Sequence, residues 1–213
     1  MADVKICGIR TAEDYAVASN AGARWVGMVF FARSPRSLSL EEAAELRDQA
    51  PQDGADRVAL VVDADDQSLA AIIAAARPQM LQCHGSETPA RLAEIKANHG
   101  LPVMKAIRVE DRGSLEDALA YDAVADWMLF DSAPQDASLP GGTGHRFDWG
   151  LMQQWQGQKP WMLAGGLSAD NVAEAITISG ARAVDVSSKV EQTPGNKDHA
   201  AIQAFVSAAV WAT

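Results

Sequence analysis

Short apolar runs alternate along the chain with longer segments in which apolar residues recur at helical spacing. The runs are rich in branched and aromatic residues, which is typical of β-strands. We expect eight strands, at residues 4–9, 25–31, 57–62, 80–84, 103–109, 127–131, 161–164 and 183–186. The remaining segments predict eight helices, at residues 13–21, 40–50, 68–76, 89–97, 115–124, 149–156, 169–179 and 200–212.

The ends of several predicted helices carry residues that stabilise helix termini. Ser39 with Glu42 fits a capping box, and Thr88 precedes Pro89 at a first helical position. Glycine follows three of the helices, at Gly22, Gly100 and Gly180. These signals support a regular alternation of strand and helix.

Eight strands that alternate with eight helices predict a single α/β domain over residues 1–213. The expected architecture is a (β/α)₈ TIM barrel, with eight parallel strands inside and eight helices outside. A doubly wound open sheet is the alternative, but the count of eight, ending on a helix, favours the barrel. In either fold the chemistry gathers at the carboxyl ends of the strands.

The composition of the chain narrows the classes of partner that we expect for it. The net charge is −10, which argues against nucleic acid or an anionic membrane as the main partner. No apolar run is long enough to span a membrane, and the first residues do not resemble a signal peptide. The two cysteines lie far apart, which indicates reduced thiols. We therefore expect a cytoplasmic protein that acts on small molecules.

Titratable residues fall at the predicted strand ends. Cys7 ends the first strand, with Lys5 on the same face two residues earlier, and Asp131 ends the sixth. A thiol has a pKa near 8.5, and a nearby cation lowers it. Because Lys5 lies about 7 Å back along the strand, we expect its effect on Cys7 to be partial. A buried structural cysteine and a helix-capping aspartate are the plainer interpretations of Cys7 and Asp131.

The fourth predicted strand separates two kinds of position. Gln82 and His84 share its inward face, where His84 fits either a substrate contact or a structural role. Cys83 faces the helices and takes a core position, on the wrong face to pair with Cys7 or to share a metal. No metal site is expected.

Two features of the catalytic face suit a phosphate group. Loops after the seventh and eighth strands commonly bind phosphate in such barrels. Their backbone amides and hydroxyls here belong to Gly165, Gly166, Ser187 and Ser188. The long connection at residues 132–146 adds Gly142 and Thr143, for which a phosphate contact and a simple turn are equally good interpretations.

The motifs and their order resemble those of phosphoribosylanthranilate isomerases of tryptophan biosynthesis. The matching stretches are KICG at 5–8, GMVFF at 27–31, SPRS at 34–37, LQCHG at 81–85, FD at 130–131, GGTG at 141–144, FDW at 147–149, AGGL at 164–167, DVSS at 185–188 and VE at 190–191. The resemblance covers nearly the whole chain, and its strength lies in the placement of the motifs at successive strand ends.

The resemblance implies an Amadori rearrangement of a phosphosugar, by general acid and base without metal or other cofactor. Cys7 would be the base, Asp131 the acid, and Arg36 the ligand of the anthranilate carboxylate. Lys5, Gln82 and His84 complete the expected substrate contacts. The expected phosphate site consists of Gly142, Thr143, Gly165, Gly166, Ser187, Ser188 and Lys189. A monomer or a homodimer is expected.

Two positions depart from the family pattern. Lys189 stands where the family usually has glycine, and His145-Arg146 stands where it usually has lysine. Three other functions stay open: the related histidine-pathway isomerase, which is expected to use two aspartates; a non-catalytic barrel that binds phosphorylated ligands; and a cysteine-based redox or metal protein. Lys189 at the phosphate site favours the second, whereas Cys7 and Asp131 argue against it.

Overall fold

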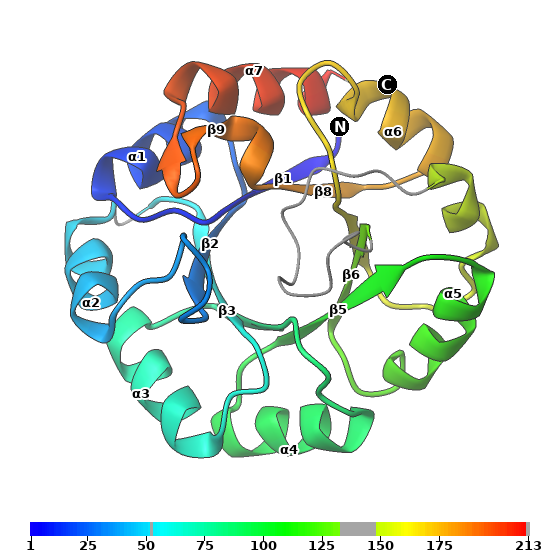
Figure 1. The fold of residues 1–213 in the computed structure, drawn as a ribbon, viewed down its shortest axis with the longest axis horizontal. Coiled ribbons are helices and arrows are strands. Elements are labelled where there is room, and N and C mark those ends of the chain that lie inside the picture. Colours follow the sequence, from blue (N-terminus) through cyan, green and yellow to red (C-terminus); the bar gives the residue numbers. More distant parts are fainter. Residues whose placement is uncertain (52, 133–147, 212–213) are drawn as a thin grey trace.

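The computed structural model describes residues 1–51, 53–132 and 148–211. Its centre is a closed barrel of eight parallel strands, in which each strand pairs with the next and β8 pairs with β1 (Figure 1). The strands are β1 (Asp3–Cys7), β2 (Trp25–Phe30), β3 (Asp56–Val61), β4 (Met80–Cys83), β5 (Val103–Val109), β6 (Trp127–Ser132), β7 (Trp161–Leu163) and β8 (Ala183–Val186). The predicted barrel is confirmed, and the open sheet is excluded.

Helices form a ring outside the strands (Figure 1). The α-helices are α1 (Ala12–Ala21), α2 (Leu40–Gln49), α3 (Asp66–Ala76), α4 (Pro89–His99), α5 (Arg112–Ala118), α6 (Val172–Ser179) and α7 (His199–Val210). The sixth predicted helix is a 3₁₀-helix, η2 (Trp149–Gln154), and its Gly150 disfavours a regular helix. Two further 3₁₀-helices are η1 (Leu119–Tyr121) and η3 (Ser188–Val190).

The predicted helix caps are present. Ser39 and Glu42 form the reciprocal capping box at the start of α2, and the Thr88 side chain accepts a hydrogen bond from the amide of Arg91 in α4. Helices α1, α4 and α6 end on glycines in the left-handed conformation. Local chemistry therefore fixes where these helices begin and end.

A small hairpin follows β8 and was not predicted. It consists of the antiparallel strands β9 (Glu191–Thr193) and β10 (Asn196–Lys197), between η3 and α7. In Figure 1 it lies at the end of the barrel near α1 and α7. Gly195, with φ of +85°, packs so closely that a Cβ atom there would lie 2.5 Å from the carbonyl oxygen of Pro35. The hairpin is therefore seated on the loop after β2.

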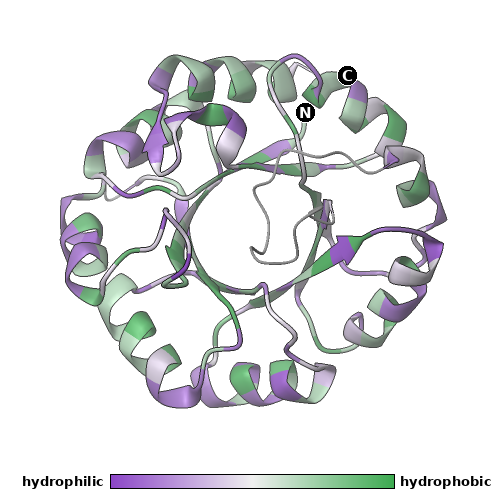
Figure 2. Ribbon diagram, viewed as in Figure 1, coloured by the Kyte–Doolittle hydropathy of each residue, from purple (hydrophilic) through white to green (hydrophobic). Residues whose placement is uncertain are grey.

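The core has two layers, as the alternation in each strand requires. Outward-facing strand residues pack against the helices, and Figure 2 shows hydrophobic colouring concentrated along the strands and inner helix surfaces. Inward-facing residues fill the barrel itself: Trp25, Val58, Met80, Met104, Ala106, Leu129, Met162, Ala164 and Ala183. Within the described residues, no helix combines the length and apolarity needed to cross a membrane.

Candidate active site

The carboxyl ends of the strands surround a cavity of about 60 Å³ at the mouth of the barrel. Its walls include Cys7 from β1, Asp131 from β6 and Asp185 from β8, together with Arg36 and His84 from the loops after β2 and β4. The structure thus brings together both predicted catalytic residues, which are 124 positions apart in the chain (131 − 7).

Lys5 lies directly beside the Cys7 thiol. A Cβ atom added to Gly27, the β2 partner of Cys7, would lie 2.8 Å from Cys7 Sγ and 3.1 Å from Lys5 Nζ. The expected spacing of about 7 Å described the backbone rise over two residues, and the long lysine side chain closes that gap. Gly27 leaves the space in which the thiol and the ammonium meet.

Lys5 forms a buried ion pair with Asp185. Parallel register places the two residues opposite each other on β1 and β8, and Nζ donates to Oδ1 at 2.9 Å. Burial disfavours the charge of Lys5, but Asp185, with a smaller effect of Cys7, raises the pKa of the ammonium above its usual value. Lys5 is fully buried and lines none of the cavities described here, so its contacts are with Asp185 and Cys7.

Burial dominates the acidity of Cys7. It raises the pKa of the thiol, and the positive charges of Lys5 and Lys197 oppose it while Asp185 reinforces it. The expected influence of Lys5 is therefore real but too small to lower the pKa overall. In the free protein Cys7 is mainly a thiol at neutral pH.

His84 lies between the side chains of Asp131 and the buried Gln82. Its Nε2 lies 3.6 Å from Oδ2 of Asp131, and its Nδ1 lies 3.2 Å from Nε2 of Gln82. His84 Nε2 and Gln82 Oε1 are both buried, and neither has a hydrogen-bond partner in the described part of the chain. The buried side chain of Gln82 thus contacts His84 at Nδ1, and Nε2 of His84 faces the cavity that Asp131 lines.

Arg36 already binds a carboxylate of the protein. Its Nε and Nη2 donate to the two carboxylate oxygens of Glu191 at 2.8 and 2.7 Å. Guanidinium has five N–H donors, so three, including both on Nη1, are left by this pair. The arginine stem lies over Gly8, where a Cβ atom would be 2.6 Å from Arg36 Cδ. Arg36 is thus fixed at the cavity wall.

A second cavity, of about 40 Å³, adjoins the first and shares Asp131, Asp185 and Ser187 with it. Gly165 and Gly166 form one wall with φ of +89° and +64°. In the described residues, the amides of Gly165, Gly166 and Ser188 donate no hydrogen bond. Free amides that face one small cavity are typical of an anion site.

Lys189 also lines this second cavity. It lies in η3, and its φ is not in the left-handed region, so the lysine carries no backbone strain there. Its side chain is exposed at the cavity edge. Gly142 and Thr143, like His145 and Arg146, lie outside the described residues.

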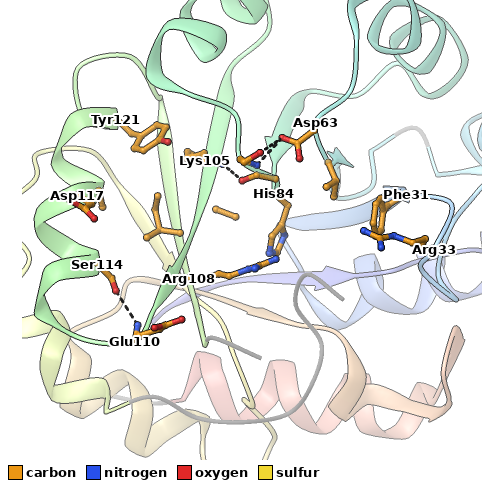
Figure 3. A pocket seen from close by; sticks show the side chains of 16 residues that line it. Phe31, Arg33, Asp63, His84, Lys105, Arg108, Glu110, Ser114, Asp117 and Tyr121 are labelled. Atoms are coloured by element: carbon orange, nitrogen blue, oxygen red, sulfur yellow. Dashed lines mark hydrogen bonds between the residues drawn. The ribbon is translucent and has the colours of Figure 1, made fainter. Parts of the chain in front are cut away.

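The largest cavity near the mouth, about 490 Å³, lies on the side of β3, β4 and β5 (Figure 3). It shares Phe31 and His84 with the smaller cavity of Cys7 and Asp131, to which the chemistry belongs. In Figure 3 the Arg108 side chain extends toward His84. Arg108 makes no hydrogen bond or ion pair within the described chain.

The two cysteines occupy different layers. Cys83 is free and packs between the strands and the helices, as predicted, and burial raises its pKa to about 12. Cys7 is also free but faces the mouth. This separation counts against a redox or metal centre that uses both cysteines.

Three site residues were missed by the sequence analysis. Asp185 and Arg108 occupy inward positions at strand ends, so the alternation that identified Gln82 and His84 also marks them. The hairpin is too short for a strand pattern to mark Glu191, and the VE match at 190–191 did not indicate its partner Arg36, which is 155 residues away.

Comparison with known proteins assigns the family. Residues 4–208 match the model of N-(5'phosphoribosyl)anthranilate (PRA) isomerase. The N-(5'-phosphoribosyl)anthranilate isomerase of Cereibacter sphaeroides is 51% identical over 207 residues, which is 97% of each chain. Among solved structures, the isomerase from Thermotoga maritima has a TM-score of 0.86 at 32% identity and 99% coverage of both chains. An isomerase solved in complex with reduced 1-(o-carboxyphenylamino)-1-deoxyribulose 5-phosphate has a TM-score of 0.84 at 31% identity, also with 99% coverage of both chains. The chain belongs to the N-(5'-phosphoribosyl)anthranilate isomerase family.

Proposed function

We propose that this chain isomerises N-(5'-phosphoribosyl)anthranilate to 1-(2-carboxyphenylamino)-1-deoxyribulose 5-phosphate in tryptophan biosynthesis, with Cys7 as general base and Asp131 as general acid. One observation carries the proposal: both groups line a single cavity that adjoins a cup of free backbone amides. Family membership supplies the reaction, and this juxtaposition supplies the groups that it needs.

The reaction begins with two proton transfers on the sugar, one at the ring oxygen and one at carbon 2, which are both bonded to carbon 1. An acid protonates the ring oxygen as the furanose opens, and a base removes the proton from carbon 2, giving an enol-amine that becomes the ketone. Asp131 and Cys7 approach the cavity from β6 and β1, so they reach a bound sugar from different sides. Lys5 beside Cys7 stabilises the thiolate, which is the form of Cys7 that accepts the proton from carbon 2.

The two ends of the substrate would occupy opposite parts of the mouth. The free amides of Gly165, Gly166 and Ser188 suit the phosphate, with Lys189 at the edge. The outward donors of Arg36 suit the anthranilate carboxylate, because Glu191 occupies only the Nε side of the guanidinium. The cavity between them, at about 60 Å³, holds little more than the reacting atoms. The rest of the substrate would extend into the adjoining cavities.

The direct test is the loss of phosphoribosylanthranilate fluorescence on addition of the purified protein. Turnover well above the spontaneous rate is expected, and turnover at background would refute the function. Two further predictions stay open, the oligomeric state and the location in the cell. Sedimentation analysis distinguishes a monomer from a homodimer, and fractionation of the source cells tests the proposed cytoplasmic location.

A further inference from the structure

The β9–β10 hairpin contributes two buried charges behind the site. Glu191 on β9 and Lys197 on β10 form an ion pair, with Lys197 Nζ 2.9 Å from Glu191 Oε1. The two side chains are 3% and 0% exposed. Lys197 also donates to the carbonyl oxygen of Ser187 at 3.1 Å. Burial of two charges is costly unless further polar partners compensate it.

Glu191 holds Arg36 as well as Lys197. Both carboxylate oxygens accept from the guanidinium, and one of them also accepts from Lys197. Burial opposes the ionisation of Glu191, but its two cationic partners outweigh burial and lower the pKa of the carboxyl. The carboxylate is therefore charged at neutral pH, and its fork fixes the plane of Arg36.

The three charges do not cancel. Arg36 and Lys197 contribute two positive charges and Glu191 one negative charge, which leaves one positive charge beside the cavity. The opposite charges of Lys5 and Asp185, which form their own ion pair, cancel each other. The charge of Lys197 acts on the Cys7 thiol and favours its ionised form, although burial lowers the pKa of Lys197 itself.

We propose that Glu191 and Lys197 are positioning residues of the reaction: Glu191 aims the free donors of Arg36 into the cavity, and Lys197 supplies the net positive charge that favours an anion there. This inference deepens the proposed function and rests on its assignment of Cys7 and Arg36. The hairpin thereby connects the binding of the substrate carboxylate to the ionisation of the base.

The first test distinguishes a role of Glu191 in orienting Arg36 from a role in folding. Glu191→Gln keeps the shape of the side chain but removes its charge, so Arg36 loses its charge-assisted fork. We expect weaker binding of the carboxylate-bearing product analogue by tenfold or more, a larger change in KM than in kcat, and unchanged affinity for ribose 5-phosphate. Glu116→Gln, which breaks an exposed pair with Arg112, is the matched control.

Two results would overturn the role of Glu191. One is equal weakening of the analogue and of ribose 5-phosphate, and the other is unchanged affinity for both. Should Glu191→Gln fail to fold, Glu191→Asp retains the charge but shortens the side chain. It is expected to weaken the analogue selectively as well, though less.

The second test needs no turnover, so it stands even if the proposed function fails. The rate of Cys7 alkylation by iodoacetamide, followed against pH in a Cys83→Ala background, reports the ionisation of the thiol. The charges of Lys5, Asp185 and Lys197 act on this thiol, and Arg36, His84 and Asp131 line the same cavity. We expect Lys197→Met to move the midpoint to higher pH and to slow alkylation at pH 8 on the order of threefold or more.

Charge rescue completes this test. Lys197→Arg retains the positive charge and is expected to keep the midpoint near that of the parent protein. Lys96→Met removes an ammonium that pairs with Asp126 away from the mouth, and it should leave the midpoint unchanged. A folded Lys197→Met protein with the parental midpoint would refute the role of Lys197. If Lys197→Met does not fold, a changed midpoint in Lys197→Arg would do the same.

Discussion

Cys7 combines proximity to a cation with a raised pKa, so at neutral pH only a small fraction of the molecules carries the thiolate that can accept a proton. Burial favours the protonated thiol, whereas the charge of Lys5 beside it favours the thiolate. A thiolate that persisted in the free protein would be open to oxidation and alkylation. Within the Lys5–Asp185 pair, Lys5 lowers the pKa of Cys7 and Asp185 raises it, so the pair changes this pKa less than Lys5 alone would.

Replacement of Cys7 by serine should abolish most of the activity. The hydroxyl is nearly isosteric but far too weak an acid to serve as this base, so we expect kcat to fall by at least 10²- to 10⁴-fold. KM should change little, because the thiol does not hold the ends of the substrate. Steady-state fluorescence kinetics measure both constants. Cys83→Ala, in the outer core layer, should retain kcat; near-normal turnover of Cys7→Ser would refute the assignment.

Asp131→Asn removes the transferable proton while it retains the volume of the side chain. We expect kcat to fall by 10²-fold or more. The alkaline limb of the pH–rate profile should disappear with the acid, and the acidic limb should persist if it belongs to Cys7. Asp126→Asn, just before the same strand at its opposite end, is the control and should leave the profile intact. Full activity of Asp131→Asn would exclude Asp131 as the acid.

At the scale of elements, the site depends on how closely β1 and β2 approach. Gly27 pairs with Cys7, and its carbonyl oxygen accepts hydrogen bonds from the amides of Gly8 and Ile9 at 2.9 Å each. The absence of a side chain at Gly27 provides the space for Sγ and Nζ. A strand contact thus determines the geometry of the base.

Gly27→Ala should impair catalysis more than folding. The added methyl group would press on the thiol and on Lys5, so we expect one or both to move. Overpacking of this kind costs about 1–3 kcal/mol of stability, and we expect kcat to fall at least tenfold. Kinetics and thermal unfolding measure the two effects. Ala183→Val overpacks the amino-terminal end of the barrel interior and should lower stability with little effect on kcat. Unchanged kcat in Gly27→Ala would show that the close approach is not required.

At the scale of the whole molecule, the pattern of hydrophobic and polar residues was enough to predict the barrel, but not the contacts between its buried charged side chains. The predicted strands agree with the observed ones to within about two residues, because strands of a closed parallel sheet are buried on both faces and therefore appear as short continuous apolar runs. Helix 115–124 was placed less well: the structure divides that region into α5 and η1. Contacts such as Arg36 with Glu191 join distant segments, and the meeting of Lys5 and Cys7 depends on side-chain conformation. No local pattern encodes either.

The buried acids of the barrel should make its stability fall at alkaline pH. Burial, reinforced by the charge of Glu87, raises the pKa of Cys83 to about 12. The unfolded chain releases this proton near pH 8.5, whereas the folded chain keeps it, so folded molecules bind more protons in between. The contribution of the Cys83 thiol to the free energy of unfolding is constant below about pH 8.5. Above that pH it is lost at about 1.4 kcal/mol per pH unit. Cys7, Tyr15 and Tyr121 also have raised pKa values and add to the trend.

Cys83→Ala measures how much the Cys83 thiol contributes to this dependence of stability on pH. At pH 7 the variant should be less stable than the parent protein, because it leaves a small cavity in the outer core layer. The difference should shrink between pH 8.5 and 10.5, since only the parent must keep a buried thiol protonated. Urea unfolding at a series of pH values, followed by tryptophan fluorescence, measures the difference. Leu81→Ala, in the same layer of β4 and without a titratable group, should show a constant difference. A constant difference for Cys83→Ala would mean that the thiol ionises as readily in the folded barrel as in the unfolded chain.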